Sequence, residues 1–225
     1  MIKVNKEIIS FKDIPSLSEN ACKSVLLVRH SYRESLQNGN FDPGLTAEGW
    51  NYAVECGKFL KGMTEVCFGA SPRQRTIQTV QALIEGGEFQ KEEPVITEYQ
   101  QLHDTAMFSP PEMLEVFIED NAIPQLLRTY FSTGNAPSMI GMKDFAGALA
   151  DFLTGTEFEK RNVILSTHDI IIMALLSFFE VYPFREDDWC GYVQGAFLYS
   201  DAAGQWTMCY AVPDREARKE CRLFV

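Results

Sequence analysis

The sequence predicts an α/β protein with three layers, α/β/α, built around a mostly parallel central sheet. Short apolar runs at 24–28 (SVLLV) and 162–167 (NVILST) have the length and composition of buried strands. Each is followed further along the chain by a segment in which apolar residues recur at helical spacing. Strands that alternate with helices in this way form parallel sheets with helices on both faces.

The expected elements follow one another along the chain. They are strands at 24–28, 65–70 and 162–167, helices at 45–62, 71–87 and 169–181, an extended segment at 94–102, a mainly helical stretch at 111–153 broken near 132–141, and a β-hairpin at 192–211. In the helix at 71–87, Ser71 fits the N-cap, Pro72 the first helical position and Gly86–Gly87 the end. The apolar cluster at 170–179 is expected to be core.

The composition favours a single domain over residues 1–225, with a mainly helical excursion at about 105–145. Of the 225 residues, 46% are hydrophobic, enough to bury a substantial core. No stretch approaches the roughly 20 apolar residues that span a bilayer, and the first residues lack the apolar block of a secretory signal. Six scattered cysteines without a Cys-x-x-Cys pair fit reduced thiols, so we expect a cytoplasmic protein that does not bind membranes.

The charge limits the partners of the chain. A formal net charge of −11 argues against a nucleic-acid partner, because surfaces that bind nucleic acid are usually basic. It is compatible with a small anionic substrate, since arginines that gather locally make a positive pocket in an acidic protein. The sequence carries no signal for the oligomeric state.

Polar, chemically capable residues stand where three predicted strands end. The groups are Arg29, His30 and Arg33 after the first strand, Ser71, Arg73 and Arg75 after the second, and Ser166, Thr167, His168 and Asp169 at the end of the third. Parallel neighbouring strands bring their carboxyl ends to one edge of the sheet, where ligands of such folds bind. Arginine forks match phosphate oxygens, and helix N-termini favour anions. The sequence therefore predicts a phosphoryl-group site at this edge.

Four segments resemble motifs of one family, and they follow one another in the same order as in that family. LLVRHSYRES is similar to the Arg-His-Gly signature of the histidine phosphatase superfamily, which includes the cofactor-dependent phosphoglycerate mutases. LTAEGWNYA, ASPRQRTIQTVQAL and LSTHDIIIMALL resemble the family's Leu-Thr-x-x-Gly helix start, its Ser-Pro-x-x-Arg-x-x-Gln-Thr segment and its second-histidine strand. Together they span roughly residues 24–176. The resemblance implies a phosphoglycerate mutase-like fold.

The resemblance also implies roles for single residues. His30 would be the nucleophile that forms a phosphohistidine, and the ligands of the phosphoryl oxygens would be Arg29, Arg75 and His168. Two residues match the acid-phosphatase branch of the family, which implies Arg33 as a further phosphate ligand and Asp169 as the proton donor. Ser31 and Ser35 depart from the glycine and proline of that branch's first motif.

A second carboxylate is an alternative proton donor. Asp104, in QQLHDTAMF, lies where the mutase branch has its acidic residue, about thirty residues beyond the pocket arginine. Of the two, we predict Asp169, because it directly follows the second histidine.

The expected function is that of a metal-independent phosphomonoesterase without a cofactor, acting on a small phosphorylated metabolite. A neutral imidazole is a competent nucleophile, and arginines stabilise the charge on the transferring group without a metal. The sequence contains no phosphate-binding loop motif, no His-Glu-x-x-His and no paired-cysteine zinc spacing. The alternatives are a mutase-type phosphotransferase and a non-catalytic phospholigand-binding protein.

Each candidate also has a purely structural interpretation. His30 fits a core or capping histidine, and His168–Asp169 fits a helix cap. For Arg73, a solvated position on a helix is the preferred interpretation, and His103 is expected to be a surface or loop histidine.

Overall fold

The computed structural model describes residues 2–35, 42–89, 94–183 and 188–214. Within these residues one sheet of eight strands runs in the order β1-β8-β7-β3-β6-β4-β5, with β2 also paired to β8. The strands are β1 (Lys3–Val4), β2 (Ile9–Ser10), β3 (Lys23–Arg29), β4 (Val66–Ala70), β5 (Ile96–Glu98), β6 (Asn162–Thr167), β7 (Gly195–Ser200) and β8 (Trp206–Val212). Strands β3, β6, β4 and β5 are parallel, and β7 runs antiparallel to both β3 and β8. The predicted mostly parallel sheet is confirmed.

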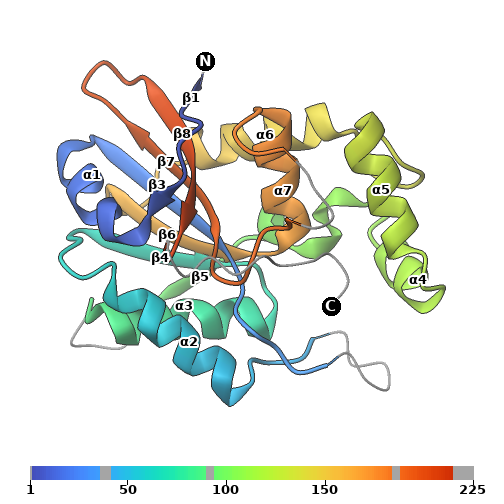
Figure 1. Cartoon of the computed structure of the whole chain (residues 1–225), viewed down its shortest axis with the longest axis horizontal. Helices are drawn as coiled ribbons and strands as arrows, with labels where there is room; N and C mark the ends of the chain where they lie inside the picture. The colour runs from blue at the N-terminus through green and yellow to red at the C-terminus, as the bar shows by residue number, and fades with distance from the viewer. Residues whose placement is uncertain (1, 36–41, 90–93, 184–187, 215–225) are drawn as a thin grey trace.

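Helices cover both faces of this sheet, as the alternating sequence pattern predicts. They are α1 (Ile14–Asn20), α2 (Ala47–Lys58), α3 (Gln74–Gly87), α4 (Met113–Glu119), α5 (Ile123–Thr133), α6 (Met142–Gly155) and α7 (Asp169–Phe178). Figure 1 shows α2 and α3 against one face and α6 and α7 against the other. Helices α4 and α5 stand to the side of these layers, between β5 and β6 in the chain.

Strand β3 is the centre of both cores. Its residues alternate between them: Val25 and Leu27 belong to the core under α6 and α7, whereas Leu26 and Val28 belong to the core under α2 and α3. Side chains of a strand point to opposite faces in turn, so a strand covered on both faces must be apolar throughout. This explains the unbroken apolar run SVLLV.

Helix α3 differs from the expectation at its beginning. It starts at Gln74, so Ser71 and Pro72 precede it and Ser71 is not its N-cap. The Gln74 backbone N–H donates instead to Oδ1 of Asp42, at 2.9 Å, so a carboxylate from a distant loop satisfies this helix end. The prediction was wrong because the capping oxygen comes from outside the local sequence.

The glycines at the other end of α3 have a packing role. A Cβ on Gly86 would lie 1.9 Å from the carbonyl oxygen of Val54, and one on Gly57 would lie 2.5 Å from that of Leu83. Helices α2 and α3 thus approach each other backbone to backbone. The helix ends one residue beyond this contact, at Gly87, and the C-cap residue Glu88 adopts a left-handed conformation with φ of 54°.

Some elements were missed or shifted. Strands β1 and β2 have two residues each, too short to show a periodicity. The extended segment at 94–102 contains only the three-residue strand β5, followed by a 3₁₀ turn at Gln100–Leu102. The first strand of the hairpin begins at Gly195 rather than at 192.

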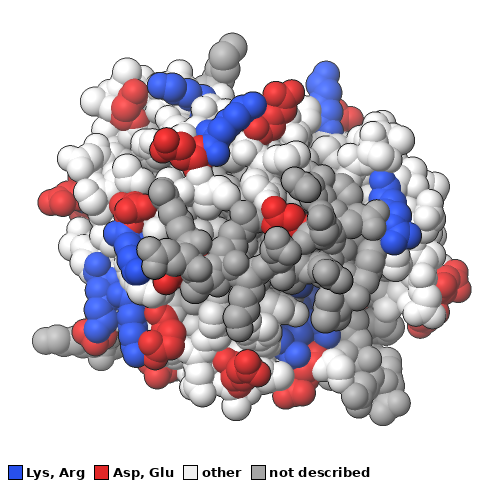
Figure 2. Space-filling model, viewed as in Figure 1, with Lys and Arg blue, Asp and Glu red and all other residues white. Residues whose placement is uncertain are grey.

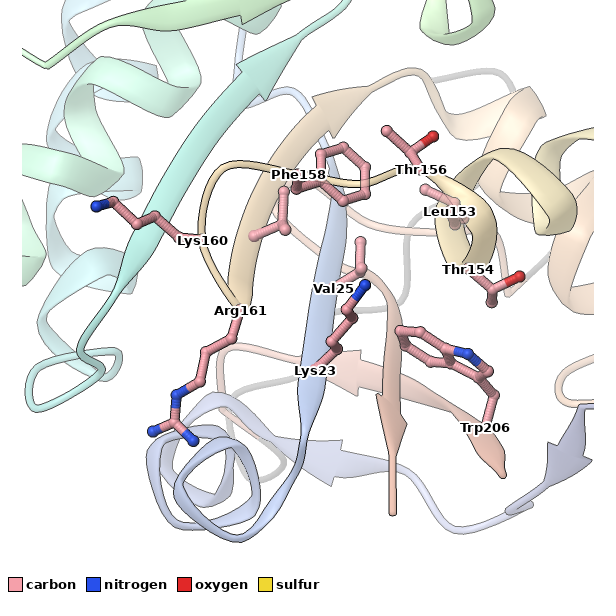
Figure 3. Close-up of a pocket in the computed structure, with 10 residues that line it drawn as sticks. Lys23, Val25, Leu153, Thr154, Thr156, Phe158, Lys160, Arg161 and Trp206 are labelled. Atoms are coloured by element: carbon pink, nitrogen blue, oxygen red, sulfur yellow. The ribbon is translucent and has the colours of Figure 1, made fainter. Parts of the chain in front are cut away.

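The surface of the described residues carries charges of both signs. On the face seen in Figure 2, Lys and Arg are interspersed with Asp and Glu. No helix in the described ranges has the length and apolar character that crossing a membrane requires. The pocket in Figure 3 lies at the amino ends of β3 and β6, near Lys23 and Arg161, and its volume of about 10 Å³ suits a single water.

Candidate active site

Hydrogen bonds between strand ends bring the sequence-predicted residues together. The register of β3 and β6 pairs Arg29 with Thr167, and the His30 N–H donates to the Thr167 carbonyl at 2.9 Å. The Ser71 N–H donates to the Ser166 carbonyl, also at 2.9 Å. The three strand ends therefore meet at one edge of the sheet, and the rings of His30 and His168 lie 5.6 Å apart between their centroids.

The ring of His30 is buried and oriented by the backbone. Only 5% of the residue is exposed, and Nδ1 lies 2.8 Å from the carbonyl oxygen of Ser31. A carbonyl can only accept, so Nδ1 carries the proton and Nε2 keeps its lone pair in the neutral ring. Ser31 is itself fixed, because the Ser31 N–H donates to Thr79 Oγ1 and the Ser31 hydroxyl donates to the Gly49 carbonyl.

The surroundings of His30 favour its neutral form. Burial lowers its pKa well below the usual value, and the positive charges of Arg29 and Arg75 lower it further. At neutral pH the ring is therefore uncharged. A neutral imidazole with Nε2 unprotonated has the form that a nitrogen nucleophile requires.

His168 is held by Ser71 and Arg75. Its Nε2 lies 3.0 Å from the Ser71 hydroxyl, and Nδ1 lies 3.4 Å from Nη2 of Arg75. Burial lowers the pKa of His168 well below the usual value, and Arg75 adds to the effect. A guanidinium can only donate, so Nδ1 of the neutral ring accepts, and Nε2 carries the proton and donates it to the Ser71 hydroxyl.

Asp169 lies against Arg29. Its Oδ2 forms an ion pair with Nη2 of Arg29 at 3.0 Å and accepts from the indole N–H of Trp189 at 3.0 Å. Its Oδ1 accepts from the N–H of Ile170 at 2.8 Å. Burial on its own would raise the pKa of Asp169, but the charge of Arg29 and these hydrogen bonds outweigh it and hold the pKa below the usual value.

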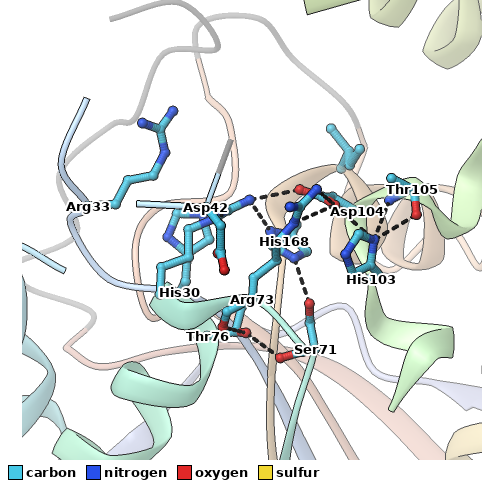
Figure 4. Close-up of polar contacts among 12 residues, drawn as sticks. His30, Arg33, Asp42, Ser71, Arg73, Thr76, His103, Asp104, Thr105 and His168 are labelled. Carbon is cyan, nitrogen blue, oxygen red and sulfur yellow. Dashed lines mark hydrogen bonds and ion pairs between the residues drawn. The ribbon is translucent and has the colours of Figure 1, made fainter. Parts of the chain in front are cut away.

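Asp104 joins two arginines on the other side of the histidine pair. Its Oδ1 accepts from Nε and Nη2 of Arg73, at 3.2 and 3.0 Å, and its Oδ2 accepts from Nη2 of Arg75 at 2.8 Å. His103 adds its Nδ1 at 3.1 Å from Oδ1 of Asp104. Figure 4 shows His103 and Asp104 beside His168. Asp104 is the first residue of the short 3₁₀ turn at Asp104–Met107.

Arg33 does not join this cluster. Its Nη1 donates to the carbonyl of Glu34 at 2.8 Å, and Figure 4 shows its guanidinium extending away from the two histidines. The structure thus brings together His30, His168, Arg29, Arg75, Asp169 and Asp104, and places Arg33 outside them. The roles of these residues remain proposals.

Sequence reasoning missed several residues of the site. Arg73 is not a solvated helix residue: 13% of its side chain is exposed and it binds Asp104. His103 is half-buried against the same carboxylate rather than on a free surface. Ser71 was expected at this edge of the sheet, but its contact with His168 was not predicted. Trp189 and Tyr192 come from a segment without a motif, and no signal in the sequence announced them.

The fold and the site define a class of protein: an α/β protein with a pair of histidines and several arginines at the carboxyl edge of a parallel sheet. The model of the histidine phosphatase superfamily (branch 1) matches residues 25–190. The chain belongs to this superfamily. No curated protein matches the chain.

Solved structures share its fold at low sequence identity. A mycobacterial glucosyl-3-phosphoglycerate phosphatase in complex with VO3 has 20% identity and a TM-score of 0.57, over 84% of this chain and 98% of the other. A phosphoglycerate mutase from Bacillus anthracis has 16% identity and a TM-score of 0.56, over 88% and 95%. YhfR from Bacillus stearothermophilus has 16% identity and a TM-score of 0.55, over 81% and 93%. These similarities establish the phosphoglycerate mutase-like fold.

Proposed function

We propose that this chain is a phosphomonoesterase that transfers the phosphoryl group of a small metabolite to His30 and then to water. The observation that carries the proposal is the state of the His30 ring. It is buried and neutral, its Nδ1 is tied to the Ser31 carbonyl, and its Nε2 is left to attack. Splitting the displacement into two steps through a phosphohistidine is ordinary covalent catalysis.

Arg29, Arg75 and His168 are the proposed ligands of the phosphoryl oxygens. The transferring group carries charge on its three outer oxygens, so cations that are already in place supply much of the acceleration. Arg75 is suited to this role because it is 5% exposed and already holds a carboxylate at 2.8 Å. Arg33, which extends away from the histidines, is a weaker candidate for such a ligand.

For the proton donor, the geometry favours Asp104 over the predicted Asp169. Asp169 is occupied by Arg29 and Trp189, and its lowered pKa makes it a poor acid. Asp104 also binds guanidinium groups, but one of them, Arg75, is a proposed ligand of the phosphoryl group, so the carboxyl of Asp104 would lie beside that group. Asp169 then serves to hold Arg29 in place.

The proposal is tested by the fate of the phosphoryl group. The full chain is incubated with 4-nitrophenyl phosphate and with a panel of labelled phosphorylated metabolites, with His30→Ala as the matched inactive control. Hydrolysis predicts inorganic phosphate as the only labelled product. Label found mainly on a second organic product would favour the mutase alternative. Tight vanadate binding with no turnover on any substrate would favour the phospholigand-binding alternative, and either result would overturn the hydrolase.

A further inference from the structure

The guanidinium of Arg29 is fixed mainly by one short segment, residues 189–194. Its Nη1 donates to the carbonyl of Cys190 at 2.7 Å, and the ring of Tyr192 lies 4.2 Å from its central carbon. Its Nη2 binds Asp169, which in turn accepts from Trp189 of the same segment. Apart from Asp169, these partners of the guanidinium lie outside the motifs of the sequence.

The ring of Tyr192 is itself wedged in place. Its centroid lies 6.0 Å from that of His30 and 4.3 Å from that of Tyr32. Tyr32 also packs edge-on against Tyr52, at 5.3 Å. Tyr192 thus lies against both Arg29 and His30 at the end of β3, and its contact with Tyr32 limits the freedom of the ring to turn.

The backbone that carries Tyr192 is strained. Val193 is fully buried and has φ of 58°, a conformation that β-branched residues rarely adopt. It is kept there by β3, because the Val193 N–H donates to the Arg29 carbonyl at 3.1 Å and the Arg29 N–H donates to the Gln194 carbonyl at 2.8 Å. Strain of this kind persists only where surrounding contacts enforce it, and it clusters at functional sites.

We propose that Tyr192 is a positioning residue of the phosphoryl subsite, whose ring holds the Arg29 guanidinium beside His30 through a cation–π contact. The inference rests on the proposed function in one step, that Arg29 binds the phosphoryl group. A guanidinium over an aromatic face is attracted by the negative charge of the ring face. The contact fixes the fork in advance, so that less freedom is lost when an anion binds.

The experiment uses vanadate as the probe and varies the ring without changing its shape. Tyr192 is replaced by phenylalanine and by mono-, tri- and pentafluorinated phenylalanine, and the dissociation constant of vanadate is measured by calorimetry. Fluorine withdraws charge from the ring face while the packing is nearly kept. We expect Tyr192→Phe to resemble the parent and the fluorinated series to bind progressively more weakly, by about 3- to 30-fold at its end. Tyr192→Leu should weaken vanadate binding by a factor in the same range.

The controls separate the inference from the proposed function. The same series at Tyr52, which packs on Tyr32, should leave vanadate binding unchanged. Arg29→Met should weaken binding more than any change at Tyr192; if it does not, the proposed phosphate site fails rather than the inference. A flat series at Tyr192, with Arg29→Met still weakened, would overturn the inference. Tighter vanadate binding on fluorination would also overturn the inference, because the ring would then only screen the charge of Arg29.

Discussion

The carbonyl oxygen of Ser31 lies 2.8 Å from Nδ1 of His30, and this contact keeps the proton of the neutral ring on Nδ1 and the lone pair on Nε2. It uses the backbone, so the serine that replaces the usual glycine of the family's motif does not disturb it. The serine side chain is instead buried and bound to the Gly49 carbonyl at 2.7 Å. The departure from the motif is therefore accommodated away from the nucleophile.

His30→Ala should abolish turnover and the acid-labile phosphoenzyme, because no other neutral imidazole of the described site has the same free nitrogen. In the measurement, the protein is mixed with labelled substrate, the reaction is quenched rapidly without acid, and the labelled residue is identified. His103→Gln, which removes the third histidine, should still form the labelled enzyme. Label on any side chain other than His30 would contradict the assignment.

The choice between the two carboxylates is decided by the leaving group. If Asp104 is the donor, Asp104→Asn should lower the hydrolysis of alkyl phosphates by about 10²-fold or more, the usual scale of general acid catalysis. Nitrophenolate leaves without a proton, so phosphorylation by its ester should fall much less. Asp169→Asn should lower the hydrolysis of both substrates to a similar degree, because Asp169 no longer holds Arg29 in place. A leaving-group dependence in Asp169→Asn alone would restore the prediction made from the sequence.

Stability should fall as the pH drops below about 6.5, because of the buried histidines. The pKa values of His30 and His168 are lowered in the folded protein, whereas in the unfolded chain these rings take up protons near pH 6.5. The unfolded state therefore binds more protons in this window. The free energy of unfolding should drop by up to about 1.4 kcal/mol per pH unit for each ring.

Urea unfolding at a series of pH values measures this dependence. A double variant, His30→Asn with His168→Asn, should have a much flatter slope, whatever its stability at pH 7. The lowered pKa of Asp169 does not interfere, since a carboxylate of this kind loses its contribution only below about pH 3.9. Equal slopes in the parent and the double variant would mean that the two rings are protonated when folded.

Ser71→Ala should lower kcat/KM by about 2- to 10-fold, the range of one neutral hydrogen bond. The hydroxyl lies 3.0 Å from Nε2 of His168, and alanine supports neither tautomer of that ring. The loss should also appear in the inhibition constant of vanadate. Ser132→Ala, an exposed serine on α5, is the matched control and should leave both values unchanged. No change in Ser71→Ala would show that His168 needs no partner on this side.

Activity should persist after treatment with a chelator, and vanadate should inhibit it. The proposed cations are guanidinium groups and the proposed nucleophile is a nitrogen, so the chemistry requires no metal. The assay compares initial rates before and after removal of divalent ions, with a metal-dependent phosphatase as the positive control for the chelator. Loss of activity that a divalent ion restores would show that the mechanism is different.

Much of the fold was predictable because its signals are local. The buried strands at 24–28 and 162–167 are short apolar runs, and their carboxyl ends carry the polar residues that the sheet then gathers at one edge. The side chain that caps α3 was not predictable, because the oxygen that accepts from the Gln74 N–H belongs to Asp42, 32 residues away. Caps supplied from a distance leave no pattern in the local sequence.

The sequence by itself determined the layered fold, the family, the strand-end positions of His30 and His168 and the place of Arg75 in the next helix, because periodicity and motif spacing are properties of neighbouring residues. Only the tertiary structure decided the partners of these side chains. It placed Asp169 on Arg29, Asp104 between two arginines and Tyr192 under a guanidinium. Such contacts join segments far apart in the chain, and the charge state and orientation of each group depend on burial and on those partners. A linear pattern does not contain them.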